Sequence, residues 1–343
     1  MAKSDNAFVR VKNLRKYFRT GTQIPLLKEN PPVRAVENVS FDVIKGETLG
    51  VVGESGCGKS TVARLLMQLI KPDAGEIIID GLAVDQRGGI SIRDMRHRMQ
   101  MVFQDSYATL NPRMPIEESI AFGPISNGKK ASEAIQESKE VMDQVGLDPN
   151  LYLHRYPHEL SGGQRQRVNI ARALVMGPEV IILDEAVSAL DKSVEAQVLN
   201  LLSDLKSELK LTYIFISHDL NVVKYISDKV MVMYLGEVVE YGTVEDVYNS
   251  PKHPYTAALL ASQPSMDPSR KLKSVPITGD PPNPINPPLG CKFHTRCPMV
   301  NDMCRTVNPN LQSTDKVHHR SACHLSSNIT VAKTLNAQER LNS

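Results

Sequence analysis

Residues 48–61 read TLGVVGESGCGKST, and this stretch decides the fold. Its first five residues are a continuous apolar run, which is typical of a buried strand in a parallel sheet. Residues 53–60 match the pattern G-x-x-x-x-G-K-[ST], and a helical apolar pattern follows over residues 62–70. A glycine-rich turn can match this pattern by chance. Strand, turn and helix in this order, however, are the context in which it holds nucleotide phosphates.

The residue types in this loop suit a phosphate site. Gly53, Gly56 and Gly58 let backbone amides approach phosphate oxygens, and the N-terminus of the next helix adds donors. Lys59 would place its charge on the β- and γ-phosphates, and Ser60 would offer its hydroxyl to Mg²⁺. We therefore predict that ATP contacts the whole loop, which comprises Gly53, Glu54, Ser55, Gly56, Cys57, Gly58, Lys59, Ser60 and Thr61.

A second motif, VIILDE at residues 180–185, places two acidic residues at the end of another apolar run. Ligands of open α/β sheets bind at the carboxyl ends of the strands. Asp184 would reach Mg²⁺ through water, and Glu185 would polarise the attacking water as a general base. Strands often end in acidic residues, so the motif alone is weak evidence for an ATPase site. Its spacing from Lys59 is what supports this interpretation.

The rest of the pattern predicts an α/β fold. Strands are predicted over residues 9–17, 39–43, 76–80, 213–216 and 230–233, with 39–43 at a sheet edge. Residues 105–175 are predicted to be mostly helical, with Ser132 as a helix N-cap. Strands that alternate with helices indicate a mainly parallel sheet.

Size and charge narrow the class of protein. A chain of 343 residues is long enough for one large domain and a smaller one. Its net charge of +2 gives no electrostatic reason to expect nucleic acid as a partner. No apolar run approaches the roughly 20 residues that span a bilayer, and no signal-peptide pattern is present. We therefore expect a cytosolic protein whose five cysteines form no structural disulfides.

Residues 160–167, LSGGQRQR, make the prediction specific. Ser161 can cap a helix, and Gly162 and Gly163 can expose amides at its N-terminus, where a γ-phosphate can bind. This stretch resembles the signature sequence of ABC ATPases. The resemblance is strengthened by order along the chain, because Lys59, Gln104, Ser161, Glu185, Asp191 and His218 follow one another as the family requires.

The resemblance implies a fold and further site residues. The fold would be an ABC nucleotide-binding domain with a RecA-like P-loop core, an N-terminal antiparallel β subdomain and an α-helical subdomain at about 105–175. Gln104 would contact Mg²⁺ and the attacking water, and His218 would contact the γ-phosphate, so these two and Glu185 are the expected catalytic residues.

The resemblance also implies a second ATPase subunit and an adenine contact. Residues Ser161, Gly162, Gly163 and Gln164 would close on ATP held by that second subunit, with Asp191 at the dimer seam. Phe18 would stack on adenine, with Tyr17 as the alternative. One departure is the pair Ala186-Val187, because Pro-Thr is commoner after the catalytic acid. We expect little effect of it on hydrolysis.

Two C-terminal stretches narrow the resemblance. Residues 251–262, PKHPYTAALLAS, and 276–297, PITGDPPNPINPPLGCKFHTRC, resemble the ATPase subunits of dipeptide and oligopeptide importers. Related importers carry glutathione, opines, antimicrobial peptides or nickel. The chain would then divide into an ATPase domain at 1–250 and an extension at 251–343.

The importer resemblance implies partners and a location. They are a second, non-identical ATPase subunit, two permease subunits and an extracytoplasmic solute-binding protein. The subunit would sit peripherally on the cytoplasmic face of the inner membrane. A soluble ABC protein of translation or DNA repair is the alternative, but such proteins usually carry two cassettes or a long coiled coil. An exporter ATPase usually lacks a cysteine-rich tail.

Four of the five cysteines follow the proline-rich stretch, in the spacing C-x₅-C-x₆-C-x₁₈-C. They are Cys291, Cys297, Cys304 and Cys323, with four histidines nearby. Composition alone leaves zinc, an iron–sulfur cluster and unligated thiols equally open. The importer resemblance favours a [4Fe–4S] cluster over zinc. The expected cofactors are thus ATP, Mg²⁺ and this cluster.

Overall fold

The computed structural model describes residues 7–19, 31–262, 277, 279–316 and 318–329. Among them, an antiparallel sheet has the strand order β2-β1-β4-β5. Its strands are β1 (Ala7–Phe18), β2 (Val33–Ile44), β4 (Ala74–Ile79) and β5 (Leu82–Ala83). The predicted edge strand is β2, and the N-terminal antiparallel subdomain is therefore confirmed.

The larger sheet has the order β11-β12-β10-β9-β3-β8-β7-β6. Strands β6, β7, β8, β3 and β9 run parallel, and β10, β12 and β11 continue the sheet antiparallel. Their bounds are β3 (Thr48–Val52), β6 (Met99–Val102), β7 (Val180–Asp184), β8 (Thr212–Ile216), β9 (Lys229–Tyr234), β10 (Glu237–Thr243), β11 (Gln312–Ser313) and β12 (Arg320–Ser321). The mainly parallel sheet predicted from the alternating pattern is present.

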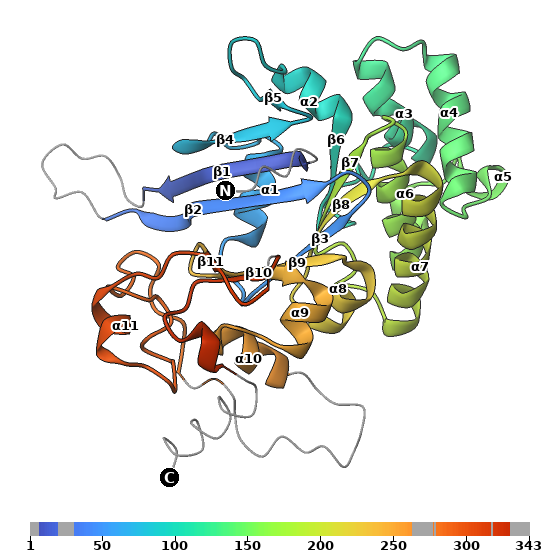
Figure 1. Ribbon diagram of the computed structural model, residues 1–343. Coiled ribbons are helices and arrows are strands. Elements are labelled where there is room, and N and C mark those ends of the chain that lie inside the picture. Colours follow the sequence, from blue (N-terminus) through green and yellow to red (C-terminus); the bar gives the residue numbers. More distant parts are fainter. Residues whose placement is uncertain (1–6, 20–30, 263–276, 278, 317, 330–343) are drawn as a thin grey trace, which may run out of the picture.

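The helices lie on both sides of this sheet. They are α1 (Lys59–Leu66), α2 (Ile92–Arg98), α3 (Ile116–Ser126), α4 (Ala131–Gln144), α5 (Pro149–Tyr152), α6 (Gly162–Leu174), α7 (Lys192–Leu209), α8 (Leu220–Ile226), α9 (Val244–Asn249), α10 (Pro254–Ala261) and α11 (Asp302–Thr306), with short 3₁₀ turns η1 (Pro157–Glu159) and η2 (Ser326–Asn328). Figure 1 shows α3, α4, α5 and α6 grouped on the side away from the antiparallel sheet. They span residues 116–174, within the range 105–175 predicted to be mostly helical.

Two hydrophobic cores share the strands of the large sheet. Ile181 and Leu183 of β7 pack into the core beneath the helical group, whereas Val180 and Ile182 pack into the core beneath the antiparallel sheet. Successive side chains of a strand point to opposite faces, so one apolar run can serve both cores. This explains why every position of β3, β7 and β8 is buried and why these strands are mainly apolar rather than alternating.

One predicted helix start was wrong. Helix α4 begins at Ala131 with Lys130 at the N-cap position, two residues before Ser132. The chain turns at Gly128, which has a φ of 96°. It is therefore already directed into the helix before Ser132, which lies within the first turn.

The C-terminal extension is joined to the large sheet. Residues 279–288 form neither helix nor strand, because proline lacks the backbone N–H that both need, and Pro276 lies outside the described residues. Strand β12 pairs with β10, and Ala322 N donates to Val239 O at 2.8 Å. Figure 1 shows the part of the extension that carries α11, β11 and β12 beside β10 and the extension's own first helix, α10.

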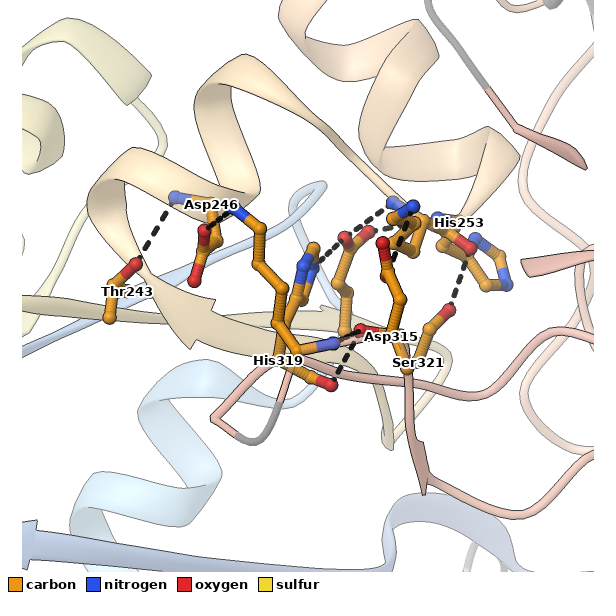
Figure 2. Close-up of polar contacts among 10 residues, drawn as sticks. Thr243, Asp246, His253, Asp315, His319 and Ser321 are labelled. Atoms are coloured by element: carbon orange, nitrogen blue, oxygen red, sulfur yellow. Dashed lines mark hydrogen bonds and ion pairs between the residues drawn. The ribbon is translucent and has the colours of Figure 1, made fainter. Parts of the chain in front are cut away.

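A buried polar cluster fastens this extension in place (Figure 2). Glu240 accepts hydrogen bonds from the backbone N–H groups of Lys252 at 2.6 Å and His253 at 3.0 Å, and its Oε1 lies 2.6 Å from His319 Nε2. Ser321 Oγ donates to the carbonyl of Lys252 at 2.8 Å. Glu240 and His319 are fully buried, so these contacts are shielded from solvent.

Candidate active site

The glycine-rich loop leaves β3 at Val52 and enters α1 at Lys59, as the sequence predicts. Two of its glycines are required by close approaches of backbone. A Cβ on Gly53 would lie 2.2 Å from Met233 O, and one on Gly58 would lie 2.3 Å from Ala35 O. Both residues also have a positive φ that favours glycine, 149° for Gly53 and 108° for Gly58. The loop therefore packs tightly against β9 and β2.

Lys59 points back into the loop. Its side chain is buried, and Nζ donates hydrogen bonds to Gly53 O at 2.7 Å and to Glu54 O at 3.2 Å. The amine thus lies where the loop amides would surround a phosphate. Cys57 is buried beside it, and burial raises the pKa of the Cys57 thiol. A neutral, buried thiol leaves the backbone of Cys57 as the part that can contact a phosphate.

Ser60 of the phosphate loop and Asp184 of the VIILDE motif, both expected to hold Mg²⁺, are in contact. Ser60 Oγ donates to Asp184 Oδ1 at 2.9 Å, so the start of α1 contacts the end of β7. Burial raises the pKa of Asp184, and the hydrogen bond from Ser60 opposes this rise. A hydroxyl and a carboxylate are oxygen ligands of the kind that Mg²⁺ prefers, so this donor pair fits the metal.

The three predicted catalytic residues also come together. Gln104 Nε2 donates to Glu185 Oε2 at 2.9 Å, and His218 Nδ1 lies 3.5 Å from the same oxygen. They follow the ends of β6, β7 and β8, which are neighbours in the sheet. A carboxylate between an amide and an imidazole can accept a proton from water placed at the same edge.

Glu185 adopts a backbone conformation that the sequence does not indicate. Its φ is 50°, in the left-handed region that non-glycine residues rarely occupy. Two hydrogen bonds hold it there, from Glu185 N to Ile216 O at 2.9 Å and from Ser188 Oγ to Glu185 O at 2.9 Å. Ala186 and Val187, which stand where Pro-Thr is commoner, are buried. Strained backbone of this kind collects at functional sites.

The signature residues begin α6 as predicted. Ser161 is the N-cap: its Oγ accepts from Gln164 N at 3.3 Å, and its own N–H donates to Gln164 Oε1 at 2.9 Å. A Cβ on Gly163 would lie 2.5 Å from Val194 Cγ1, so only glycine fits against α7. Asp191 is the exposed N-cap residue of α7. Ser161 is also exposed, as a contact to a second subunit requires.

Tyr17 and Phe18, the aromatic pair at the end of β1, differ in their contacts and in their exposure. The Tyr17 hydroxyl donates to Glu37, whereas the Phe18 ring is 38% exposed. Lys16 Nζ lies 5.8 Å from the centre of the Phe18 ring. This arrangement favours Phe18 over Tyr17 as the adenine contact, which stays a prediction.

The structure reveals two contacts to the phosphate loop that the motifs do not indicate. Arg296 Nη1 and Nη2 donate to the two carboxylate oxygens of Glu54 at 2.8 and 2.9 Å. Tyr255 OH accepts a hydrogen bond of 2.8 Å from Glu54 N. Both partners come from the C-terminal extension. The only signal for them in the sequence is their position inside the two stretches that narrow the resemblance.

The four cysteines line one small cavity together with His253, His294, His324 and Phe293. Burial raises the pKa of Cys291 to about 11 and those of Cys297 and Cys323 to about 12. Within the described part of the chain, however, no three Cys, His, Asp or Glu side chains are arranged to hold a metal ion. The donors are thus of the right chemical type for a thiolate-bound group, but this arrangement is not a ready-made metal site.

A groove of about 290 Å³ lies beside Gln104, between β6, α3 and α6. Its walls include Phe103, Phe122 and Met176. The Phe122 side chain is 61% exposed and stands on the wall of this groove. Across the ranges that the structure describes, no helix is both long and apolar enough to cross a membrane.

Comparison with known proteins identifies relatives over nearly the whole chain. Residues 36–188 match the ABC transporter family, and residues 239–304 match the C-terminal region of oligopeptide/dipeptide transporters. The oligopeptide transport ATP-binding protein AppF of Bacillus subtilis is 45% identical over 94% of this chain and 99% of its own length. The dipeptide transport ATP-binding protein DppF of Haemophilus influenzae is 46% identical over 87% of this chain and 91% of its own.

Solved structures confirm the fold. CbiO1 of Clostridium perfringens, part of an ABC transporter complex, has a TM-score of 0.60 and 27% identity. The match covers 71% of this chain and 91% of that one. The ATP-binding cassette MJ0796, solved as a dimer bound to ADP and Pi, has a TM-score of 0.58 and 27% identity over 69% of this chain and 98% of its own.

Proposed function

Because the chain belongs to the ABC transporter ATP-binding proteins with an oligopeptide/dipeptide-type C-terminal region, we propose that it is the ATP-hydrolysing subunit of a peptide importer. One observation carries the catalytic part: Gln104 and His218 converge on the single carboxylate of Glu185. The relatives named for oligopeptide and dipeptide transport support the peptide cargo.

The proposed reaction uses residues from five parts of the chain: β1, the phosphate loop with α1, and the ends of β6, β7 and β8. Amides of residues 53–61 and Lys59 hold the phosphates, and the exposed Phe18 ring stacks on adenine. Ser60, Gln104 and Asp184 would hold Mg²⁺, which would supply positive charge to the phosphates. Glu185 accepts a proton from the attacking water, and Gln104 and His218 fix the carboxylate and the water.

The signature helix supports a two-subunit mechanism. Ser161, Gly162, Gly163 and Gln164 would contact ATP held by a second ATPase subunit, with Asp191 at the seam. Each ATP would then join two subunits, and hydrolysis would release them. The dimeric, product-bound state of the solved cassette MJ0796 supports such an assembly.

The groove beside Gln104 supports a membrane partner. An exposed Phe122 on its wall suits an apolar helix, and we assign the groove to a cytoplasmic helix of a permease subunit. Two permeases and an extracytoplasmic solute-binding protein would complete the importer, with this subunit on the cytoplasmic face of the membrane. The near-neutral net charge of +2 gives no electrostatic reason to expect a nucleic-acid partner.

Co-purification tests the importer assignment. The tagged chain, extracted from membranes in mild detergent with ATP, should bring down permease subunits that mass spectrometry identifies. Lys59→Ala, which should not bind nucleotide, controls for ATP-dependent assembly. Isolation of the chain without any membrane protein under these conditions would exclude the importer assignment.

We further propose that Cys291, Cys297, Cys304 and Cys323 hold a [4Fe–4S] cluster, with zinc as the alternative. Their shared cavity supports a common ligand, although the thiols would have to move closer to it and lose their protons. Anaerobically purified protein should absorb near about 400 nm and contain iron. Stoichiometric zinc without iron would refute the cluster.

A further inference from the structure

Glu54 presents an electrostatic problem for a phosphate-binding loop. It follows Gly53 directly, and its backbone carbonyl accepts a hydrogen bond from Lys59. A carboxylate at this point repels the phosphates of a nucleotide, and the repulsion is strong where solvent is limited. The side chain is 25% exposed, so water screens it only in part. A neutralising partner would therefore strengthen nucleotide binding.

Arg296 is that partner. Its guanidinium makes a two-pronged contact with Glu54, at 2.8 and 2.9 Å, and its side chain is only 6% exposed. Such paired hydrogen bonds fix the carboxylate in position as well as neutralising it. Arg296 Nη1 also donates to Tyr234 OH at 3.3 Å. Tyr255 accepts from the Glu54 N–H, so both the side chain and the backbone of Glu54 are held from outside the loop.

Arg296 is close to the cysteine cavity in the chain. It lies in the turn between Cys291 and Cys297, both of which line that cavity. Within the turn, His294 N donates to Cys291 O at 3.0 Å and Arg296 N donates to Phe293 O at 3.0 Å. The Phe293 ring centre lies 5.4 Å from those of both Tyr234 and Tyr255. Cavity, turn and phosphate loop thus form one packed unit.

We propose that Arg296 is a positioning residue of the nucleotide site, and that the cysteine cavity controls the affinity for nucleotide through it. This inference deepens the proposed function, because it rests on residues 53–61 holding the phosphates. A change at the cysteines moves the turn, withdraws Arg296 and leaves the charge of Glu54 facing the phosphates.

A charge-based mutant cycle tests the first part. Arg296→Met in the full-length protein should weaken binding of a fluorescent ATP analogue by about tenfold, as expected for loss of a charge-assisted contact. Glu54→Gln with Arg296→Met should return to within about threefold of wild type, because no charge is left to repel phosphate. Arg305→Met, an identical change on α11 of the same extension, is the matched control and should bind normally.

The single variant Glu54→Gln completes the mutant cycle. The outcomes of the cycle then distinguish an effect of charge from an effect of packing. If Arg296→Met weakens binding by the same factor in the wild-type background and in the Glu54→Gln background, the role of Arg296 is structural and the proposal fails. Unchanged binding in Arg296→Met also overturns it. If the methionine variant does not fold, Arg296→Gln is measured alone and with Glu54→Gln, and the same comparison applies.

The cysteine part has its own test. Cys291→Ser with Cys297→Ser should weaken nucleotide binding in the wild-type background but not in the background of Glu54→Gln with Arg296→Met. Equal effects in the two backgrounds, including no effect in either, would overturn control by the cavity. Lys59→Ala separates failure of the proposed function from failure of this inference. If Lys59→Ala still binds ATP, the proposed phosphate site is wrong. If Lys59→Ala loses binding but Arg296→Met binds normally, only the role of Arg296 is wrong.

Discussion

The side-chain amide of Gln104 donates a 2.9 Å hydrogen bond to Glu185, although 81 positions separate the two residues. The contact joins the ends of two adjacent parallel strands, β6 and β7. His218 approaches the same carboxylate oxygen from the end of β8. Glu185 is therefore the centre of the polar group at this sheet edge, and Gln104 connects its carboxylate to the end of β6.

Replacing Glu185 with glutamine should separate binding from hydrolysis. The amide keeps the shape of the side chain but cannot accept a proton from water. We expect retained ATP binding, a trapped closed dimer and hydrolysis lower by orders of magnitude. Phosphate release and size-exclusion chromatography with ATP measure the two effects. Near-normal turnover of the variant would remove Glu185 from the role of base.

Lys59→Ala should fail at an earlier step. Lys59 Nζ already lies against the carbonyls of Gly53 and Glu54, within the loop that would hold phosphate. Loss of this charge should abolish measurable ATP binding. The fold should persist, because among the described residues the only side chain that Lys59 hydrogen-bonds is the weak acceptor Cys57. Fluorescent-nucleotide titration tests this, with the exposed Lys71→Ala as the control.

Local patterns explain why so much of this site was predictable. The loop at 53–60, the two acids at the end of β7 and the cap at Ser161 each depend on residues close in sequence. The left-handed backbone of Glu185 was not predictable, because neither Glu185 nor Ala186 favours it. The Glu54–Arg296 pair spans 242 positions, and strands β11 and β12 have two residues each, too few to show a period. These features depend on tertiary packing alone.

Asp184→Asn should stabilise the metal-free protein. Burial raises the pKa of Asp184, so the folded state favours the protonated acid. The protonated acid therefore has its full stability below the unfolded-state pKa of about 4, and this stability is lost as the pH rises through the folded-state pKa of Asp184. At pH 7 the ionised carboxylate therefore opposes folding. The asparagine variant should gain free energy of unfolding, by about 1.4 kcal/mol for each tenfold difference in acidity between the folded and unfolded states.

Urea unfolding in EDTA at pH 7 and pH 4 measures this gain, with the exposed Asp204→Asn as control. The gain should be present at pH 7 and absent at pH 4. A gain of equal size at both values would show that charge is not its cause. The same variant should lose Mg²⁺-dependent hydrolysis, since a neutral amide is a poor Mg²⁺ ligand.

Phe122→Asp should uncouple the subunit from its permease. Phe122 is a large exposed apolar side chain on the groove, and such anchors contribute about 2 kcal/mol or more to an interface. We expect loss of permease co-purification and of peptide uptake, with ATP binding by the isolated subunit unchanged. Leu151→Asp, a similarly exposed apolar position on α5, is the control. Normal uptake by Phe122→Asp would remove the groove from permease binding.

The buried cluster around Glu240 gives the sharpest prediction for stability. Glu240→Ala would leave two backbone N–H groups and the His319 ring without their acceptor in a fully buried space. Loss of one partner from such a cluster should lower the free energy of unfolding by about 3–5 kcal/mol. Ser321→Ala removes one neutral hydrogen bond and should cost about 1 kcal/mol.

Urea unfolding measures both variants, and limited proteolysis reports release of the extension. Glu245→Ala, an exposed acid in the first turn of α9, is the matched control and should cost less than about 1 kcal/mol. Because β12 pairs directly with β10, proteolysis of Glu240→Ala should begin between residues 279 and 329 before the nucleotide-binding core is cut. Simultaneous cleavage of core and extension would show that the two unfold as one unit.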